Sequence, residues 1–179
     1  METLSSDSAF DILLQSTYDD VLNLCKSYSI FFNICRKSYF WQQKALYDFG
    51  ISAQAFNLLP GNNKARYEYL LSIDPNNGLF YSADVGNLEL VNYFINRGAR
   101  NYNLAARTAA KQGHIKIVNQ MLQLGANDYN GVMITAAARG HRDIVDQMLQ
   151  RGATDYYKAL FWANEKGHQD IANLIRSYM

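Results

Sequence analysis

The sequence has little of several patterns that mark other classes of protein. It contains two cysteines and two prolines, and no apolar run approaches the roughly 20 residues that cross a bilayer. Its formal net charge of +1 argues against binding to nucleic acid or to an anionic membrane through bulk charge. The first residues lack the basic flank and apolar stretch of a signal peptide. From these absences we expect a cytoplasmic protein with no nucleic-acid and no membrane partner.

Residues that carry chemistry are equally scarce. Cys25 and Cys35 lie in apolar helical sequence without a Cys-x-x-Cys partner, so we expect buried free thiols in a reducing compartment. No glycine loop that could cradle a phosphate is present. We therefore expect no catalytic residue, no metal, no cofactor and no enzymatic activity.

Apolar residues make up 49% of the chain and charged residues 18%, which is typical of a globular protein. No alternating, β-branched segment bounded by hairpin turns occurs, so we expect an all-α fold. The segments 60–63 and 74–78 are strong turn signals, and the residues between them predict a short helix over 64–73. These signals divide the chain into an N-terminal helical domain over 1–60, a connector helix within 61–75, and a third segment over 76–179.

The third segment repeats itself. Glycine followed by Asn or His recurs every 27 residues, at positions 86, 113, 140 and 167, with an aliphatic pair soon after each. Self-similarity at a fixed period is the signature of a solenoid, in which each unit buries its apolar face on its neighbours. We expect four units: 76–102, 103–129, 130–156 and 157–179.

Each unit is expected to contain two helices. The pattern predicts first helices over 104–112 and 132–139, and second helices over 115–124 and 143–151. The second helix of the second unit carries an apolar stripe of Ile117, Val118, Met121 and Leu122. The histidines fall at the corners between helices, and stacked helices lie about 8–10 Å apart, which is too far for metal bonds of about 2 Å. We interpret them as turn residues that cap the second helices; they are His114, His141 and His168.

The segment Ala-Ala-Lys-Gln-Gly-His-Ile-Lys-Ile-Val at 109–118 resembles the helix–turn–helix core of ankyrin repeats, and the resemblance covers about 76–179. The period departs from the family, whose repeats are about 33 residues long. The shortfall of about six residues falls where the family has its β-hairpin. We expect tight turns instead of projecting hairpins. The resemblance implies a protein partner bound on the concave face of the first helices.

Residues at the ends of the first helices differ between units while their surroundings agree, so they are either solvated or a recognition surface. The aromatic pairs 80–81 and 161–162 favour recognition, because exposed aromatics and Arg anchor many interfaces. The candidate residues of the concave face are Tyr81, Asp84, Arg107, Lys111, Gln112, Arg139, Trp162, Glu165 and Lys166.

Residues 4–50 place apolar groups at helical spacing and predict a small bundle of three helices. Their order resembles an F-box, although Ser5 stands where that family has proline and Ser27 where it has an aliphatic residue. The resemblance implies docking on the adaptor Skp1 of a cullin-type ubiquitin ligase, whereas core packing is the alternative role for the same side chains. The candidate adaptor-binding residues are Leu4, Ile12, Leu13, Leu22, Leu24 and Trp41.

An F-box-like segment followed by short ankyrin-like repeats is similar to proteins of large DNA viruses of protists, which implies the host cytoplasm as the location. Our leading hypothesis is a monomeric adaptor whose repeats hold a target protein while the F-box-like segment recruits the ligase. The alternative is a stand-alone ankyrin scaffold or decoy, in which the N-terminal helices form a folded cap.

Overall fold

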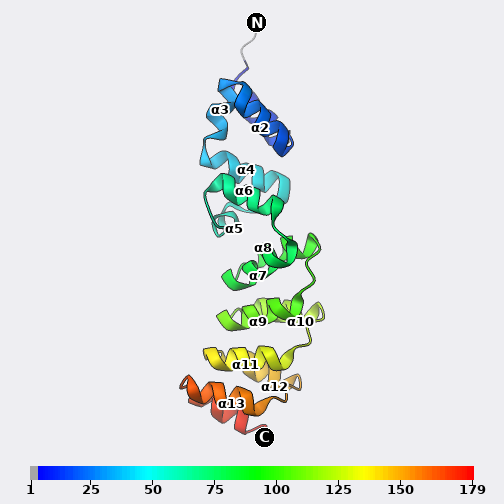
Figure 1. The fold of residues 1–179 in the computed structure, drawn as a ribbon, viewed down its shortest axis with the longest axis vertical. Helices are drawn as coiled ribbons and strands as arrows, with labels where there is room; N and C mark the ends of the chain where they lie inside the picture. The colour runs from blue at the N-terminus through cyan, green and yellow to red at the C-terminus, as the bar shows by residue number, and fades with distance from the viewer. Residues whose placement is uncertain (1–3) are drawn as a thin grey trace. The chain divides into compact units, whose positions relative to one another are not determined.

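The computed structural model of the chain describes residues 4–179, and within this range every regular element is a helix. The chain divides into two compact units, Met1–Ile73 and Asp74–Met179, which we call the N-terminal unit and the repeat unit. Figure 1 draws both units as coiled ribbons without strands. The prediction of an all-α fold with an ankyrin-like solenoid is confirmed.

The repeat unit consists of four helix pairs. The first helix of each pair begins 27 residues after the previous one, at Pro75, Tyr102, Tyr129 and Tyr156. Each second helix packs on the first helix of its own pair, and the first helices pack on one another in chain order, so that the pairs stack as layers (Figure 1). The helices are α7 Pro75–Val85, α8 Leu88–Asn96, α9 Tyr102–Gln112, α10 Ile115–Gln123, α11 Tyr129–Arg139, α12 Arg142–Gln150, α13 Tyr156–Glu165 and α14 Gln169–Arg176.

The first helices begin slightly before their predicted starts, at Tyr102 rather than 104 and at Tyr129 rather than 132. A capping side chain explains the earlier start of α11. Asp128 precedes this helix and accepts a hydrogen bond from the backbone nitrogen of Gly131 at 2.9 Å. This bond satisfies one of the amide groups that a helix leaves free at its N-terminus, so the helix extends back to Tyr129.

The apolar core of the repeats follows the predicted pattern. Ile117, Val118, Met121 and Leu122 are all buried on α10, which confirms the stripe. Ala109 and Ala110 are fully buried on α9, which is the first helix of the second pair and packs against both α7 and α11. Side chains of this size let three helices lie close together, and a larger residue would cost about 1–3 kcal/mol by overpacking.

The first repeat fills its core differently from the others. Phe94 is buried where the next two repeats place Met121 and Met148. A Cβ atom on Gly78 of α7 would collide with the Phe94 ring, and the later repeats have Ala105 and a valine at the position of this glycine. The larger ring is therefore matched by the smaller residue on the facing helix, which preserves packing density.

The loops between repeats are short and are held by asparagine side chains. The Oδ1 atom of Asn103, near the start of α9, accepts hydrogen bonds from the backbone nitrogens of Asn127 and Asp128 at 2.8 and 3.1 Å. Asn76 and Asn130 do the same for the loops at 100–101 and 154–155. These loops contain no strand, so the prediction of tight turns in place of projecting hairpins is confirmed.

Replacing Asn103 by alanine should destabilise the repeat unit. The variant loses the acceptor for two backbone N–H groups at the start of α11, and loss of a comparable helix-capping side chain costs about 0.5–2 kcal/mol. Asn103→Asp is the matched control, because it retains a side-chain oxygen at the same place. Urea unfolding should give a lower free energy for Asn103→Ala than for Asn103→Asp; equal losses would contradict this role for the asparagine.

The N-terminal unit contains four helices within its first 49 residues, where we expect three. Tyr28 takes an extended conformation with φ −135° and ψ 131°, so the chain leaves one helix there and begins the next at once. The helices of this unit are α1 Ser6–Gln15, α2 Tyr18–Ser27, α3 Ser29–Cys35, α4 Ser38–Phe49, α5 Ala53–Asn57 and α6 Asn63–Ser72.

The helix expected as a connector is α6, and it belongs to the N-terminal unit, which ends at Ile73. It packs on α4 and carries the fully buried Tyr67 and Leu70. The hydroxyl of Tyr18 on α2 donates a hydrogen bond to the carboxylate of Glu68 on α6. Burial of the phenol, followed by the effect of this carboxylate, raises the pKa of Tyr18 well above its ordinary value.

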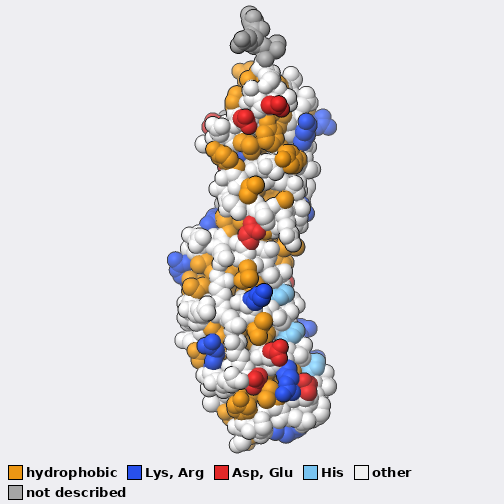
Figure 2. All heavy atoms as spheres, turned by 180° about the vertical axis from the view of Figure 1, so that it is seen from behind, with side chains coloured by type: hydrophobic (Ala, Val, Ile, Leu, Met, Phe, Trp, Pro, Cys, Tyr) orange, Lys and Arg blue, Asp and Glu red, His pale blue; other side chains and the backbone are white. Residues whose placement is uncertain are grey.

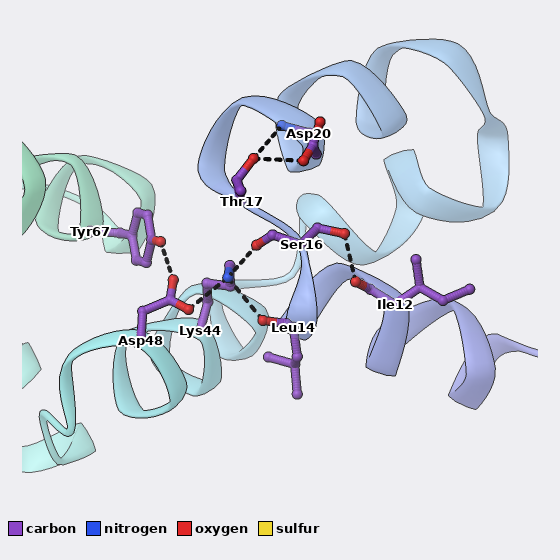
Figure 3. A network of polar contacts seen from close by, with 8 residues as sticks. All are labelled: Ile12, Leu14, Ser16, Thr17, Asp20, Lys44, Asp48 and Tyr67. Atoms are coloured by element: carbon purple, nitrogen blue, oxygen red, sulfur yellow. Dashed lines mark hydrogen bonds and ion pairs between the residues drawn. The ribbon is translucent and has the colours of Figure 1, made fainter.

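A buried lysine links three segments of the N-terminal unit (Figure 3). Lys44 on α4 has only 2% of its surface exposed, and its Nζ atom donates hydrogen bonds to the backbone oxygens of Leu14 and Ser16 at 2.9 and 2.7 Å. Its third partner is a carboxylate oxygen of Asp48 at 2.8 Å, and the hydroxyl of Tyr67 donates to the other oxygen of that carboxylate. Lys44 thereby has three acceptors, which offsets the cost of burying its charge.

The expectation of free cysteine thiols is wrong. Cys25 and Cys35 form a disulfide rather than remaining free thiols, and both are half-buried rather than buried. The cause is the turn at Tyr28, because α2 and α3 pack on each other and bring the two Cα atoms to 6.3 Å, within the range that a disulfide spans. The inference of a reducing compartment from free thiols therefore loses its premise.

Replacing Lys44 by methionine should lower the stability of the N-terminal unit by about 3 kcal/mol, because it leaves the Asp48 carboxylate and two backbone oxygens without their cation. Lys64→Met is the matched control: Lys64 also pairs with an acidic residue four positions later, at 3.5 Å, but both side chains are nearly half exposed. The control should cost less than about 1 kcal/mol.

Urea unfolding monitored by Trp41 fluorescence, with Trp162→Phe in every variant, measures both effects. Equal losses for Lys44→Met and Lys64→Met would contradict the importance of the buried network.

Candidate functional site

The C-terminal ends of the first helices are shaped by glycines and by histidines of the next repeat. Gly113 ends α9 with φ +80°, in the left-handed region that favours glycine. A Cβ atom on Gly113 would lie 2.7 Å from the His141 ring, so the ring of the following repeat also needs this residue to be small. The position of each helix end, and of the side chains just before it, is therefore set by two successive repeats.

The histidines have a structural role that joins neighbouring repeats. The Nε2 atom of His114 lies 3.2 Å from the backbone oxygen of Asp84, and that of His141 lies 3.2 Å from the backbone oxygen of Lys111. Because a backbone oxygen only accepts, Nε2 carries the proton in both bonds. Figure 2 shows the three histidines in a row along the repeat unit. They lie in the turns, as we expect, but the predicted capping role is wrong. None of the three caps its own helix through its side chain, and the rings of His114 and His141 bond instead to the previous repeat.

No cluster of three potential metal-ligating side chains occurs within residues 4–179.

The structure brings four of the nine predicted concave-face residues around one hollow. This hollow has a volume of about 420 Å³ and lies over α9, α11 and α13. The predicted residues that line it are Lys111, Arg139, Trp162 and Lys166. They come from three successive repeats, so the hollow exists only when the repeats are stacked.

The other five predicted residues do not line this hollow. Gln112 donates a hydrogen bond to the carboxylate of Asp84 at 2.8 Å and so joins the second repeat to the first. Arg107 lies 3.9 Å from Asp128 in a half-exposed ion pair. Tyr81 is half-buried and Glu165 is exposed.

Sequence reasoning missed the rest of the hollow's lining, which comes from α11. Ile134, Thr135 and Ala138 contribute it. A signal for them was present, because Ile134 and Thr135 align with the aromatic pairs of the first and last repeats, and Ala138 aligns with Lys111 and Glu165. Smaller residues in the third repeat, between bulkier ones in its neighbours, leave space on the helix surface.

The charge around the hollow is positive. Lys111, Arg139 and Lys166 are exposed and form no ion pair within residues 4–179. The Nζ atom of Lys166 lies 5.9 Å from the centre of the Trp162 ring, in a cation–π contact. No acidic side chain lines the hollow.

The predicted adaptor-binding residues of the N-terminal unit divide between surface and core. Leu4 and Ile12 are 44% and 42% exposed, and Leu22 and Leu24 are half-buried. Leu13 is fully buried, and Trp41 is 4% exposed.

Core packing explains the positions of the two buried residues. The indole nitrogen of Trp41 donates a hydrogen bond to the backbone oxygen of Cys35 at 2.9 Å, which fixes the ring inside the unit. Of the six predicted adaptor-binding residues, the two that are exposed are therefore Leu4 and Ile12. Figure 2 shows apolar side chains at the surface over this unit.

The fold and the site define a class: a stack of helix pairs whose first helices present a hollow with a cationic rim. Residues 107–178 match the family model described as ankyrin repeats (3 copies). The match begins within α9, and the helix pair α7–α8 before it continues the same 27-residue spacing. No curated protein matches the sequence of the chain.

Ankyrin repeats bind protein partners, so this part of the chain has a role in protein–protein interaction. Within residues 4–179, no helix is both long enough and apolar enough to cross a membrane.

Proposed function

We propose that the chain is a non-enzymatic adaptor that holds a target protein against the first helices of its repeats. The observation that carries this proposal is the hollow lined from three successive repeats by Lys111, Arg139, Trp162 and Lys166. Tryptophan and arginine are among the residues that contribute most to the affinity of protein interfaces. The repeats also hold the backbone of these residues in stacked helices, so little backbone entropy is lost when a partner binds.

Reversing the charge at two of these positions should abolish target binding without unfolding the chain. The variant is Lys111→Glu combined with Arg139→Glu; both side chains are exposed and make no ion pair whose loss would destabilise the fold. Lys116→Glu is the matched control, because Lys116 is exposed on α10 and does not line the hollow.

The measurement is affinity capture with the full chain, with circular dichroism as the test of folding. Proteins retained by the wild type and by Lys116→Glu should be lost from the double variant. Retention of the same proteins by the folded double variant would place the target-binding surface elsewhere.

The second part of the proposal concerns the N-terminal unit, which we expect to recruit Skp1 and thereby a cullin-type ubiquitin ligase. Its support is the F-box-like order of residues 4–50 together with the exposure of Leu4 and Ile12 near the start of the unit. Exposed aliphatic side chains on a short helical unit are a common means of docking on a partner. In this proposal Leu13 and Trp41 support the unit from its core.

Purified Skp1 should bind the full chain at micromolar concentration, and Ile12→Asp should weaken this binding about tenfold, because it places a charge in an apolar contact. Leu46→Asp is the matched control, since Leu46 on α4 is 48% exposed and has no proposed part in docking. Calorimetric titration gives the two affinities. If the wild-type chain does not bind Skp1, the ligase part is wrong and the alternative of a stand-alone ankyrin scaffold or decoy, with the N-terminal helices as a cap, is left.

A further inference from the structure

The cationic hollow of the repeat unit combines two kinds of lining. Its rim carries three positive charges: Lys111 on α9, Arg139 on α11 and Lys166 directly after α13. Its apolar part comes from Ile134, Ala138 and Trp162. An occupant that fits both must therefore present negative charge around an apolar group.

The positive charges have no counter-charge in the protein. None of the three forms an ion pair within residues 4–179, and no carboxylate lines the hollow. Elsewhere in the repeat unit, some exposed cations have acidic neighbours: Lys158 lies 2.8 Å from Asp155, and Arg142 lies 3.8 Å from Asp170. Like charges that gather without neutralisation raise the local potential and attract an anionic partner.

The apolar lining has the size and the character of a side-chain pocket. The side chain of Trp162 is 41% exposed. Lys166 lies near its ring, and apolar residues of α11 line the same hollow. A volume of about 420 Å³ lies at the lower end of the range for small-molecule pockets, about 300–1,000 Å³. A space of this size accepts one large aromatic or aliphatic side chain together with the backbone that carries it.

We infer that the hollow binds an acidic segment of the target protein, in which a large apolar side chain is flanked by aspartate or glutamate. This inference rests on the proposed function and adds the chemistry of the partner to it. The apolar side chain packs on Trp162 and Ile134, and the flanking carboxylates pair with Lys111, Arg139 and Lys166. Clusters of basic residues recognise acidic motifs by the same charge pairing in other peptide-binding proteins.

Single-stranded nucleic acid also combines negative charge with flat apolar rings. Two observations favour the peptide. Asp84 near the end of α7 and Glu165 at the end of α13 place negative charge on the first and the last of the four first helices, so the cationic stretch is short and a longer polyanion would be repelled. The formal net charge of the whole chain is only +1.

Calorimetric titration of the full chain with synthetic peptides tests this inference. The probe is a short peptide of glutamates around a central phenylalanine; matched peptides replace the glutamates by glutamine, replace them by lysine, or replace the phenylalanine by alanine. A thymidine oligonucleotide is titrated in parallel. We expect the first peptide to bind at least about tenfold more tightly than each of the others, with an affinity that falls as salt concentration rises.

Variants assign the binding to the hollow. The double variant Lys111→Glu with Arg139→Glu should lower the affinity for the acidic peptide at least about tenfold, and so should the separate variant Trp162→Ala. Lys116→Glu and Tyr157→Ala are the matched controls. Their affinities for the acidic peptide should stay within about twofold of the wild-type value, because both side chains are exposed on the repeat unit but lie outside the hollow.

Equal binding of the glutamine peptide, tighter binding of the oligonucleotide, no binding of the acidic peptide, or unchanged affinity in the hollow variants would each overturn the inference. These failures are distinguishable from failure of the proposed function. If the double variant still loses captured target proteins while the acidic peptide does not bind, the target-binding face is retained and only its preference for acidic segments is wrong.

Discussion

The hydrogen bonds that Asn76, Asn103 and Asn130 accept from the following loops are the interaction on which the repeat unit depends. Each asparagine lies near the start of one first helix and binds the backbone just before the next first helix. The short loops have no strand pairing to satisfy these amides, so the asparagine oxygens serve as their acceptors and hold each loop against the preceding first helix. In these 27-residue repeats, the asparagine side chain therefore supplies the hydrogen-bond acceptor that the backbone of a longer loop would otherwise supply.

The repeat unit was largely predictable from the sequence, because a stacked array forces its buried positions to recur. The glycines, the stripe on α10 and the buried alanines all follow from that periodicity. The helix starts at Tyr102 and Tyr129 were not predicted. The start at Tyr129 depends on a capping contact from Asp128 that is weak in the sequence pattern, and no side-chain cap accompanies the start at Tyr102. The hollow was predicted in part: the variable helix ends identified its cationic rim, while its lining from Ile134 and Ala138 required knowledge of which side chains face a common space.

The N-terminal unit was harder to predict, because nothing in it repeats. Its bundle depends on contacts between distant residues, such as Lys44 with the backbone oxygens at the end of α1, and a buried lysine contradicts the usual pattern of apolar cores. The disulfide was missed for a related reason, since the ten-residue separation of Cys25 and Cys35 shows no pairing until the turn at Tyr28 folds α2 onto α3. The same tertiary contacts place Leu13 and Trp41 in the core and leave Leu4 and Ile12 accessible.

Each kind of side chain that joins neighbouring repeats at more than one boundary has a fixed separation from its partner in the chain: 24 or 25 residues for the asparagines, 30 for His114 and His141, and 28 for Gln120 and Gln147. A duplicate of residues 103–129 inserted after the original would bring its own asparagine, histidine and glutamine. The asparagine would bind the loop at the end of its own copy, and the histidine and glutamine would find their partners in the copy before. Segments of other lengths would set these groups against the wrong neighbours. During evolution, such an array can lengthen or shorten its binding face in whole repeats without inventing a new contact.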